Sequence, residues 1–372
     1  MPTLATFNAN NFFLRYKFSK SYPGDMSKNS LIEASEIVGG PIGYLPGLAF
    51  QKYTKNYIIW DAARRQLAVK ALKELDQKLP DILCFQEVEN IHAIRLFNQK
   101  YLNGHYKYSL LIDSYDSRNI DVGILSVFPI RQIRSHIDDK DGGKLIFSRD
   151  CLEAEIELSD GSVLTLFLNH LKSKLVIRKE SETDTEYNAR VLESHEKRKK
   201  QADEVMKFVT QRFHGQHNSA LYAVIGDFND TPKSPWLNPL MTSNLLKNII
   251  TKYRQNDDCW TYYWRSKNRV SQIDYILVSE ELERRVDAAA AADPNKKPHI
   301  ERKGIGYKKL NNSGEILPKK SNLIHFEGDA VTAAPSTFTP GSKVDFRFSR
   351  YQEVNLNWKN NISDHCPVKI WF

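Results

Sequence analysis

The sequence predicts an α+β fold, a four-layer α/β/β/α sandwich in which two mainly antiparallel sheets pack face to face between outer helices. Three observations predict it: strand-like and helix-like segments are mixed throughout the chain, neighbouring strands form hairpins more often than β-α-β units, and no internal repeat is present. The chain has 372 residues, of which 41% are hydrophobic, which is adequate for one large core. We therefore expect residues 1–372 to form a single domain.

The first half of the chain combines apolar runs of strand length with amphipathic helical patterns. Asp61 is expected to cap the first helix, whose apolar face includes Leu67, Leu72 and Leu75. The expected elements are a strand at 3–7, a helix at 61–78, a strand at 82–85, a helix that contains Ile94, Leu96 and Phe97, and a hairpin-like pair at 106–112 and 122–127.

The second half continues this pattern with longer elements. The turn Ser159-Asp160-Gly161-Ser162 joins two strands into a hairpin. The expected elements are hairpin strands at 151–158 and 163–168, a long charged helix at 187–213, a buried strand at 221–225, a mostly helical stretch at 235–253, an edge strand at 260–264 and a strand at 270–278.

Two stretches lack regular periodicity, at residues 14–58 and 287–350. We expect both to be insertions into the single domain. The first carries isolated lysines, and the second carries basic pairs such as Lys296-Lys297 and Lys308-Lys309. Such lysines suit contact with a polyanion, but a solvated loop explains those of the first stretch at least as well, and solvated lysines are the default interpretation of the basic pairs in the second.

The net charge of +8 and the isoelectric point near 9.0 favour an anionic partner, such as nucleic acid, phospholipid headgroups or a phosphorylated small molecule. The four cysteines are far apart, which argues against a zinc knuckle or a redox pair and fits a reducing compartment. No leader-like N-terminus and no apolar run of membrane-spanning length is present. We expect a cytoplasmic protein without a transmembrane segment, and no protein partner can be deduced.

Polar side chains follow six of the expected strands. A single such motif fits an ordinary turn, but six strands that end in Asn, Glu, Asp or His are hard to explain by turns alone. If they converge at one end of the sandwich, they form an oxygen-rich site for a hard divalent cation with two imidazoles nearby. The six motifs are Thr6-Phe7-Asn8-Ala9-Asn10, Cys84-Phe85-Gln86-Glu87, Phe167-Leu168-Asn169-His170, Gly226-Asp227-Phe228-Asn229-Asp230, Gln272-Ile273-Asp274-Tyr275 and Ser363-Asp364-His365.

Glu87 is the strongest metal candidate, because Mg²⁺ is usually held by one or two carboxylates and by substrate phosphate. The alternative is an acid placed at a helix N-terminus, where the helix dipole favours it. Asn8 and Asn10 follow the first strand closely and would orient Glu87 or a water on its metal.

The two histidines suggest proton transfer and phosphate binding. His365 follows Asp364, and a histidine oriented by a carboxylate such as Asp274 acts as a general base toward water. His170 would donate a hydrogen bond to a phosphoryl oxygen in the transition state.

Together, the six motifs resemble the endonuclease/exonuclease/phosphatase superfamily, and they occur in the same order from Asn8 to His365. The resemblance implies that Glu87 binds the metal with Asn8 and Asp364 close to it. It further implies that Asp227 and Asn229 orient the nucleophile and the phosphate, that Asp274 supports His365 as the general base, and that His170 stabilises the phosphate. Asn10 lies where abasic-site endonucleases often have an acid, and His170 resembles the deoxyribonuclease and sphingomyelinase arrangement.

These residues predict a magnesium-dependent phosphodiesterase, in first place a nuclease acting on DNA or RNA, with Mn²⁺ or Ca²⁺ as alternative cations. The alternative substrate is a phospholipid, an inositol phosphate or another small phosphoester. A non-catalytic binding protein is the third hypothesis, and it conflicts with the presence of every central acid and histidine. Further expected contacts with substrate phosphate come from Asn10, Arg118, Arg149, Lys172 and Lys174.

Overall fold

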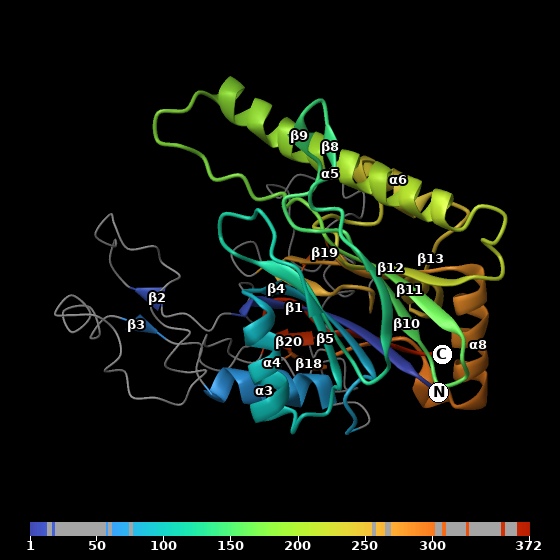
Figure 1. Cartoon of the computed structure of the whole chain (residues 1–372). Helices are drawn as coiled ribbons and strands as arrows, with labels where there is room; N and C mark the ends of the chain where they lie inside the picture. The colour runs from blue at the N-terminus through green and yellow to red at the C-terminus, as the bar shows by residue number, and fades with distance from the viewer. Residues whose placement is uncertain are drawn as a thin grey trace, which may run out of the picture.

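Two six-stranded sheets packed face to face form the centre of the protein (Figure 1). The computed structural model describes residues 1–12, 17–18, 57–58, 62–73, 77–254, 258–264, 269–301, 307–309, 325–326, 351–353 and 363–372. Buried side chains of both sheets belong to one core cluster, which includes Phe7 and Ile124 from the first sheet and Leu166 and Ile225 from the second. The predicted α+β sandwich is confirmed.

Both sheets are mainly antiparallel, as predicted. The first contains, in spatial order, β17 (His299–Ile300), β21 (Val368–Trp371), β1 (Thr3–Phe12), β4 (Ile82–Val88), β6 (Asp121–Ser126) and β5 (Tyr108–Leu111). The second contains β13 (Lys247–Asn248), β16 (Asp274–Val278), β12 (Leu221–Asp227), β11 (Val163–His170), β10 (Leu152–Glu157) and β7 (Ile130–Arg134). Within these two sheets, the parallel neighbours are β1 with β4 and β11 with β12.

The two parallel pairs bring polar strand ends together, because the carboxyl ends of parallel strands meet at the same edge of a sheet. In the first sheet Asn8 lies beside Gln86, which precedes Glu87. In the second sheet His170 lies beside Asp227, and the antiparallel β16 begins with Asp274 opposite Asp227. The polar ends of both sheets therefore meet at one end of the sandwich.

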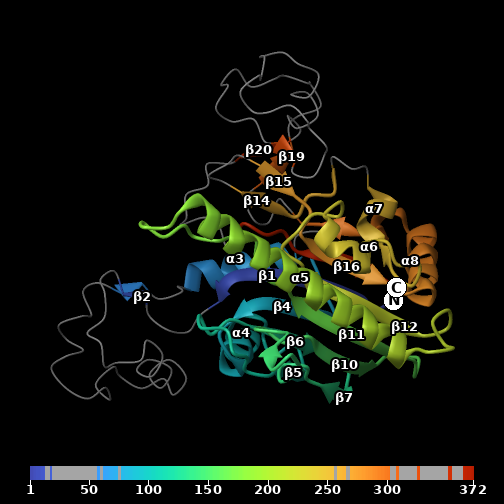
Figure 2. The same ribbon diagram turned by 90° about the horizontal axis from the view of Figure 1, so that it is seen from above.

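Helices cover the outer faces of the two sheets (Figures 1 and 2). The first sheet is covered by α3 and α4, and the second by α5, whose Val205 and Val209 pack in one cluster with Phe167 and Tyr222. A capping box between Thr183 and Glu186 begins α5. The helices are α3 (Ala62–Lys73), α4 (Ile91–Tyr101), α5 (Asp184–Arg212), α6 (Asn238–Met241), α7 (Ile249–Tyr253) and α8 (Glu280–Ala292), with 3₁₀ turns η3 (Pro235–Leu237) and η6 (Pro294–Lys296).

Short strands form smaller sheets around this centre. One of these sheets lies beside the polar strand ends, because Tyr262 also forms an isolated β-bridge with His365. The short strands are β14 (Tyr262–Trp264), β15 (Arg269–Ser271) and β19 (His325–Phe326) in one sheet, β18 (Tyr307–Lys309) with β20 (Tyr351–Glu353), β2 (Lys17–Phe18) with β3 (Tyr57–Ile58), and β8 (Lys140–Asp141) with β9 (Lys144–Leu145).

Several expected elements differ in the structure. Residues 287–292, expected at the start of the second insertion, complete α8, and β17 joins the first sheet. The edge strand β7 was not expected, the stretch 235–253 is divided into short helices and β13, and 270–278 contains two strands separated by Gln272 and Ile273. Asp61, the expected helix cap, and most of both expected insertions lie outside the described residues.

His136 fixes the segment between β7 and β10. Its ring stacks on Phe208 of α5 with the ring centroids 3.7 Å apart. Its Nδ1 lies 2.9 Å from Asp139 Oδ2 and its Nε2 lies 3.6 Å from Glu153 Oε2. Burial alone would lower the pKa of His136, but Glu153 and Asp139 outweigh burial and raise it above its ordinary value.

The pH dependence of stability tests this role of His136. Since its pKa is higher in the folded state, its contribution is fully present below about pH 6.5 and is lost as pH rises through the raised folded value. We expect the wild type to lose more free energy of unfolding across this range than a His136→Gln variant, measured by urea denaturation at several pH values. Parallel pH curves for the two proteins would contradict this assignment.

Candidate active site

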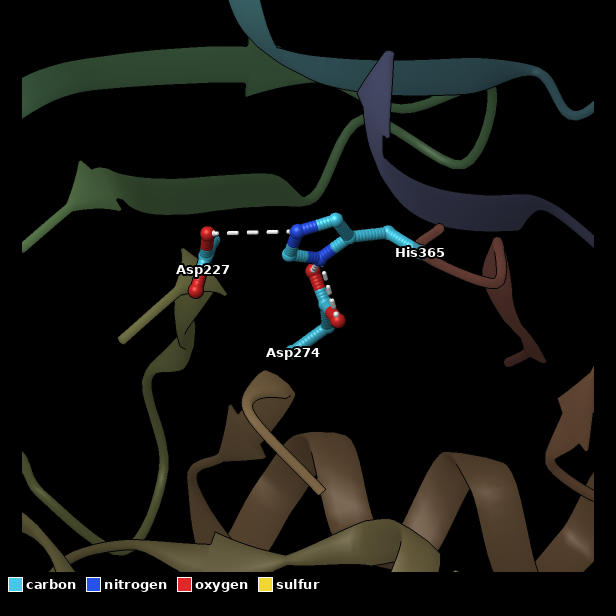
Figure 3. Close-up of side chains that lie close together, drawn as sticks. All are labelled: Asp227, Asp274 and His365. Atoms are coloured by element: carbon cyan, nitrogen blue, oxygen red, sulfur yellow. Dashed lines mark hydrogen bonds and ion pairs between the residues drawn. The ribbon is translucent and has the colours of Figure 1, made fainter. Parts of the chain in front are cut away.

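His365 lies between two carboxylates, which come from β12 and from the start of β16 (Figure 3). Its Nδ1 lies 3.0 and 3.1 Å from the two carboxylate oxygens of Asp274, and its Nε2 lies 3.9 Å from Asp227 Oδ2. All three residues are buried. The hydroxyl of Thr261 donates to Asp274 Oδ2 at 2.7 Å and accepts from the backbone N–H of Asp274. Asp274 therefore holds the imidazole with Nε2 directed at Asp227.

Asp227 receives hydrogen bonds from two asparagines. Asn8 donates from Nδ2 to Asp227 Oδ2 at 2.9 Å, which joins the first sheet to the second. Asn229 donates from its backbone N–H at 2.7 Å and from Nδ2 at 3.2 Å. The orientation of this carboxylate is therefore determined by residues of two of the predicted motifs.

Gly226 allows β12 to deliver Asp227 to this position. Its φ is +129°, and a Cβ there would lie 2.0 Å from the backbone oxygen of Asn169 in β11. No side chain fits at that distance, so the close approach of β11 and β12 requires glycine. This approach brings His170 beside Asp227, with 3.5 Å between His170 Nε2 and Asp227 Oδ2.

Strained backbone conformations occur at this end of the sandwich. Asn10, Asn11, Glu87 and Asn229 have φ between +48° and +62°, which is uncommon for residues other than glycine. Glu87 lies at the register shift where β4 leaves its regular pairing with β6. Its Oε2 accepts the backbone N–H of Asn11 at 3.0 Å, and its Oε1 lies 3.8 Å from His170 Nε2. The strain turns the Glu87 side chain toward the same centre.

The C-terminal motif is tied to the first strand. Ser363 donates its hydroxyl to the carbonyl of Asn8 at 2.8 Å and accepts the backbone N–H of His365. Asn10 donates from Nδ2 to Asp364 Oδ1 at 2.8 Å. These bonds place residues near the two ends of the chain in one site.

His170 and Arg149 form a buried pair beside Glu87. Arg149 Nη1 lies 2.9 Å from His170 Nε2, and Nη2 donates to the carbonyl of Leu171 at 3.1 Å. Because a guanidinium can only donate, the contact requires a neutral imidazole with an accepting Nε2. Burial and the charge of Arg149 hold the pKa of His170 well below its ordinary value, in agreement with a neutral ring.

The other expected phosphate contacts differ in their environment. Lys174 lies 3.3 Å from Asp230 Oδ1, and Asp230 also holds the buried guanidinium of Arg198. Arg118 is exposed and lies 3.4 Å from Asp116. Lys172 is half-buried, and its pKa is lowered by burial and by the charge of Arg149. Of these cations, Lys172 has the environment best suited to an anionic ligand.

Two carboxylates of the site, Asp227 and Asp364, hold their protons more firmly than usual because their pKa values are raised. Burial raises the pKa of Asp227 to about 7. Burial would lower the pKa of His365, but the charges of Asp274 and Asp227 outweigh it and raise that pKa. Burial raises the pKa of Asp364, and the carboxylate of Glu87 raises it further. Burial is therefore the main reason that Asp227 and Asp364 resist ionisation, and neighbouring carboxylates add to it.

The Endonuclease/Exonuclease/phosphatase family matches residues 5–292 of this sequence. The chain belongs to this family. Its members are metal-dependent hydrolases of phosphoester bonds, so the predicted family and the predicted class of enzyme are confirmed. The match includes Asn8, Glu87, His170, Asp227 and Asp274, and the contact of His365 with Asp274 attaches the C-terminal motif to them.

Three solved structures illustrate the likeness of this endonuclease/exonuclease/phosphatase chain to other proteins. Beta toxin 275-280 from Staphylococcus aureus is 13% identical, with 100% of this chain and 99% of that chain covered and a TM-score of 0.48. A family protein from Leptotrichia buccalis is 14% identical, with 100% of each chain covered and a TM-score of 0.44. The human Nocturnin catalytic domain with bound sulfate is 15% identical, with 84% and 86% covered and a TM-score of 0.45. Among curated proteins, none matches this chain in sequence.

The family implies a divalent cation, and two groups of residues compete to hold it. Asp227, Asp274 and His365 each offer a ligand atom within 4.8 Å of the others. However, Asp274 is engaged by His365 and Thr261, and Asp227 by Asn8 and Asn229. All three are buried, whereas Mg²⁺ keeps several of its waters.

Glu87 and Asp364 fit the cation better. Both are half-buried, and Glu87 is close enough to raise the pKa of Asp364, as expected for like charges near each other. A cation between such carboxylates neutralises their repulsion, and oxygen ligands suit Mg²⁺. Asn8 has both polar side-chain atoms engaged, with Oδ1 accepting the backbone N–H of Asn10, so it supports Asp227 and Asn10 directly.

Three supporting residues were missed in the sequence. Thr261 orients Asp274, Asn11 binds Glu87 through its backbone, and Asp116 lies 3.6 Å from Arg149 Nε. Asn11 directly follows a predicted motif, whereas Thr261 and Asp116 carry no local signal that separates them from other polar residues.

The helices of the described residues include none with the length and hydrophobicity that a membrane-spanning segment requires.

Proposed function

We propose that this chain is a divalent-metal-dependent nuclease that hydrolyses phosphodiester bonds of DNA or RNA. The observation that carries the proposal is the orientation of His365, whose Nδ1 is held by Asp274 and whose Nε2 is directed at the buried carboxylate of Asp227. A histidine that is held by a carboxylate at one ring nitrogen can accept a proton from an attacking water at the other ring nitrogen.

The remaining side chains have complementary roles in this mechanism. Asp227, fixed by Asn8 and Asn229, orients the nucleophilic water in line with the leaving oxygen. His170 and Arg149 bind the non-bridging phosphate oxygens, where negative charge is greatest in the transition state. Asn10 keeps Asp364 in position and lines the path of the substrate.

Glu87 and Asp364 would hold the cation, which we propose is Mg²⁺, with Mn²⁺ or Ca²⁺ as alternatives. Bound there, a divalent cation supplies Lewis-acid stabilisation of the phosphate and its leaving oxygen. Asn11 fixes one oxygen of Glu87 by a backbone hydrogen bond and leaves the other directed toward His170. Asn8 holds Asp227 and Asn10, and so supports the position of Asp364.

A phospholipid or other small phosphoester is the second candidate substrate. Leu175 and Ile177 are 69% and 76% exposed, and they follow Lys172 and Lys174 closely. Exposed aliphatic residues beside lysines are typical of surfaces that touch a lipid bilayer. The net charge of +8 favours either anionic substrate, so activity must decide between them.

Hydrolysis assays test the proposed function directly. We expect Mg²⁺-dependent cleavage of single- or double-stranded DNA or of RNA, loss of cleavage in EDTA, and a higher Mg²⁺ requirement for a Glu87→Gln variant, because one charged ligand is removed. Phospholipid vesicles and inositol phosphates serve as the competing substrates. Cleavage of these esters with no cleavage of any polynucleotide would overturn the nuclease assignment in favour of the second candidate.

We also propose that residues 1–372 form one domain with insertions at about 14–58 and 287–350. The support is the contact of both chain ends at the site, where Asn10 binds Asp364 and Ser363 binds Asn8. A protein truncated after the family match at residue 292 would lose His365.

A further inference from the structure

Three cations from three separate segments lie on one flank of the site. Arg149 precedes β10, Lys172 follows β11, and Lys197 belongs to α5. Lys197 is half-buried and has no place in the reaction described above. Its position near Arg149 and Lys172 is therefore not explained by the proposed reaction.

The position of Lys197 is determined by its helix. Ser194 donates its hydroxyl to the carbonyl of Ser173 at 2.8 Å, and Arg198 donates from Nη1 to the carbonyl of Lys172 at 2.7 Å. Gln201 accepts the backbone N–H of Lys172 and donates to the carbonyl of Ile146. Lys197 lies three residues after Ser194 and four before Gln201, so it shares the helix face that contacts Lys172.

Lys172 and Lys197 differ from other lysines of this region in their partners. Lys174 pairs with Asp230, and Lys199 pairs with Asp203. Among the described residues, no carboxylate lies within ion-pair distance of the ammonium of Lys172 or Lys197. The nearby Arg149 is 3% exposed, and its Nε has no hydrogen-bond partner there.

Burial and the nearby positive charges lower the pKa values of both lysines. The pKa of Lys172 is lowered by burial first, and then by the charges of Arg149 and Lys197. The pKa of Lys197 is lowered by burial and then by Arg149. Lysines that merely cover apolar surface extend their charge into water, away from other cations. Asp116, 3.6 Å from Arg149 Nε, offsets these charges in part, and Glu193 acts on Lys197. Neither carboxylate forms an ion pair with the ammonium of Lys172 or Lys197, so a bound anion would relieve the remaining repulsion.

We propose that Lys172 and Lys197, beside Arg149, bind a second phosphate of the substrate, next to the phosphate that reacts. The inference rests on the proposed nuclease function and narrows its substrate class. A polynucleotide carries a further phosphate on each side of the scissile bond, whereas a phospholipid with a single phosphodiester carries none. The subsite therefore favours a polynucleotide with at least one additional phosphate over a phospholipid with a single phosphodiester.

Dinucleotides with the same scissile bond test the subsite. TpT has one phosphodiester, and pTpT and TpTp each add one terminal phosphate. We expect the wild type to prefer one of the phosphorylated forms in kcat/KM, and Lys197→Met to reduce that preference roughly tenfold, as for loss of one charge-assisted contact. Methionine keeps the apolar stem of the side chain and removes the ammonium. Lys199→Met is the matched control, because Lys199 is exposed, pairs with Asp203 and belongs to the same helix.

A preference that is unchanged in Lys197→Met, or reduced equally in Lys199→Met, would overturn the second phosphate site while leaving the nuclease assignment intact. If the wild type cleaves no polynucleotide, the proposed function fails, and binding still tests the subsite. In that case, anisotropy of a fluorescein-labelled oligodeoxynucleotide in EDTA measures affinity without metal. We expect Lys197→Met to weaken this binding and to lower its salt slope by about one. Unchanged binding and slope would overturn the inference.

Discussion

Replacement of His365 by alanine is expected to reduce kcat about 10²–10⁴-fold, the range for loss of a general acid or base. The reason is geometric: Asp274 fixes Nδ1 at 3.0 Å, so the imidazole presents Nε2 to the centre of the site. Without the ring, the site loses the group that is proposed to accept the proton of the attacking water. The measurement is steady-state cleavage of the preferred polynucleotide at saturating Mg²⁺.

Two controls separate proton transfer from structural support in the His365→Ala variant. Added imidazole should restore part of the activity, because a small base can occupy the space left by the ring. The melting temperature must also be compared, since Asp274 and Asp227 stay buried without their cationic partner. A folded variant that retains more than a tenth of wild-type kcat would contradict the general-base role.

The strands that carry the site could be predicted from the sequence because their signals are local. Apolar runs followed by Asn8, Glu87, His170 and Asp227 are visible without any tertiary information. Their convergence follows from the two parallel pairs, in which strand ends meet at the same edge. The predicted motifs therefore include most of the residues that form the site.

The hydrogen-bond partners within the site could not be predicted in the same way. Asn8, which is predicted to lie close to the metal, also donates from its amide to Asp227, a residue 219 positions away. Lys174, which is predicted to contact phosphate, also lies beside Asp230. Thr261 contributes through one hydroxyl whose direction depends on the turn before β16. Such contacts depend on how side chains of the two sheets meet, and the pattern of apolar and polar residues in the sequence does not determine this.

Two fold elements were missed for different reasons. For α8 the signals were present: Ser279 caps Leu282, and Glu280, Glu281 and Glu283 occupy the first turn. The alanine-rich end of this helix was instead assigned to an insertion. For β7 the signal was absent, because residues 131–134 of this edge strand are all exposed and show no apolar alternation.

Asp227→Asn and Asp230→Asn should separate catalysis from stability, although the two carboxylates belong to one sequence motif. We expect Asp227→Asn to reduce kcat roughly 10²–10³-fold, the range for loss of one preorganised electrostatic contact. The substitution keeps the shape of the side chain but removes the charge that faces His365 Nε2 at 3.9 Å and His170 Nε2 at 3.5 Å. Burial raises the pKa of Asp227 to about 7, so the folded state favours the protonated carboxyl group over the ionised one. The stability that this preference contributes is present below about pH 4 and is lost as pH rises through about 7.

Asp230 has the opposite energetic character. Its pKa is lowered because Lys174 and Arg198 outweigh burial, and the guanidinium of Arg198 is fully buried against it at 2.8 Å. Asp230→Asn leaves that charge without its partner, which costs about 3–5 kcal/mol of unfolding free energy. Its kcat should stay within tenfold of wild type, since Asp230 faces Lys174 and Arg198. Urea denaturation and kcat are to be measured for both variants at pH 8. If Asp227→Asn lost stability as severely as Asp230→Asn and kept its kcat, Asp227 would be a structural residue. If Asp227→Asn instead kept its stability and lost kcat, the carboxylate of Asp227 would be present for the reaction in spite of its burial.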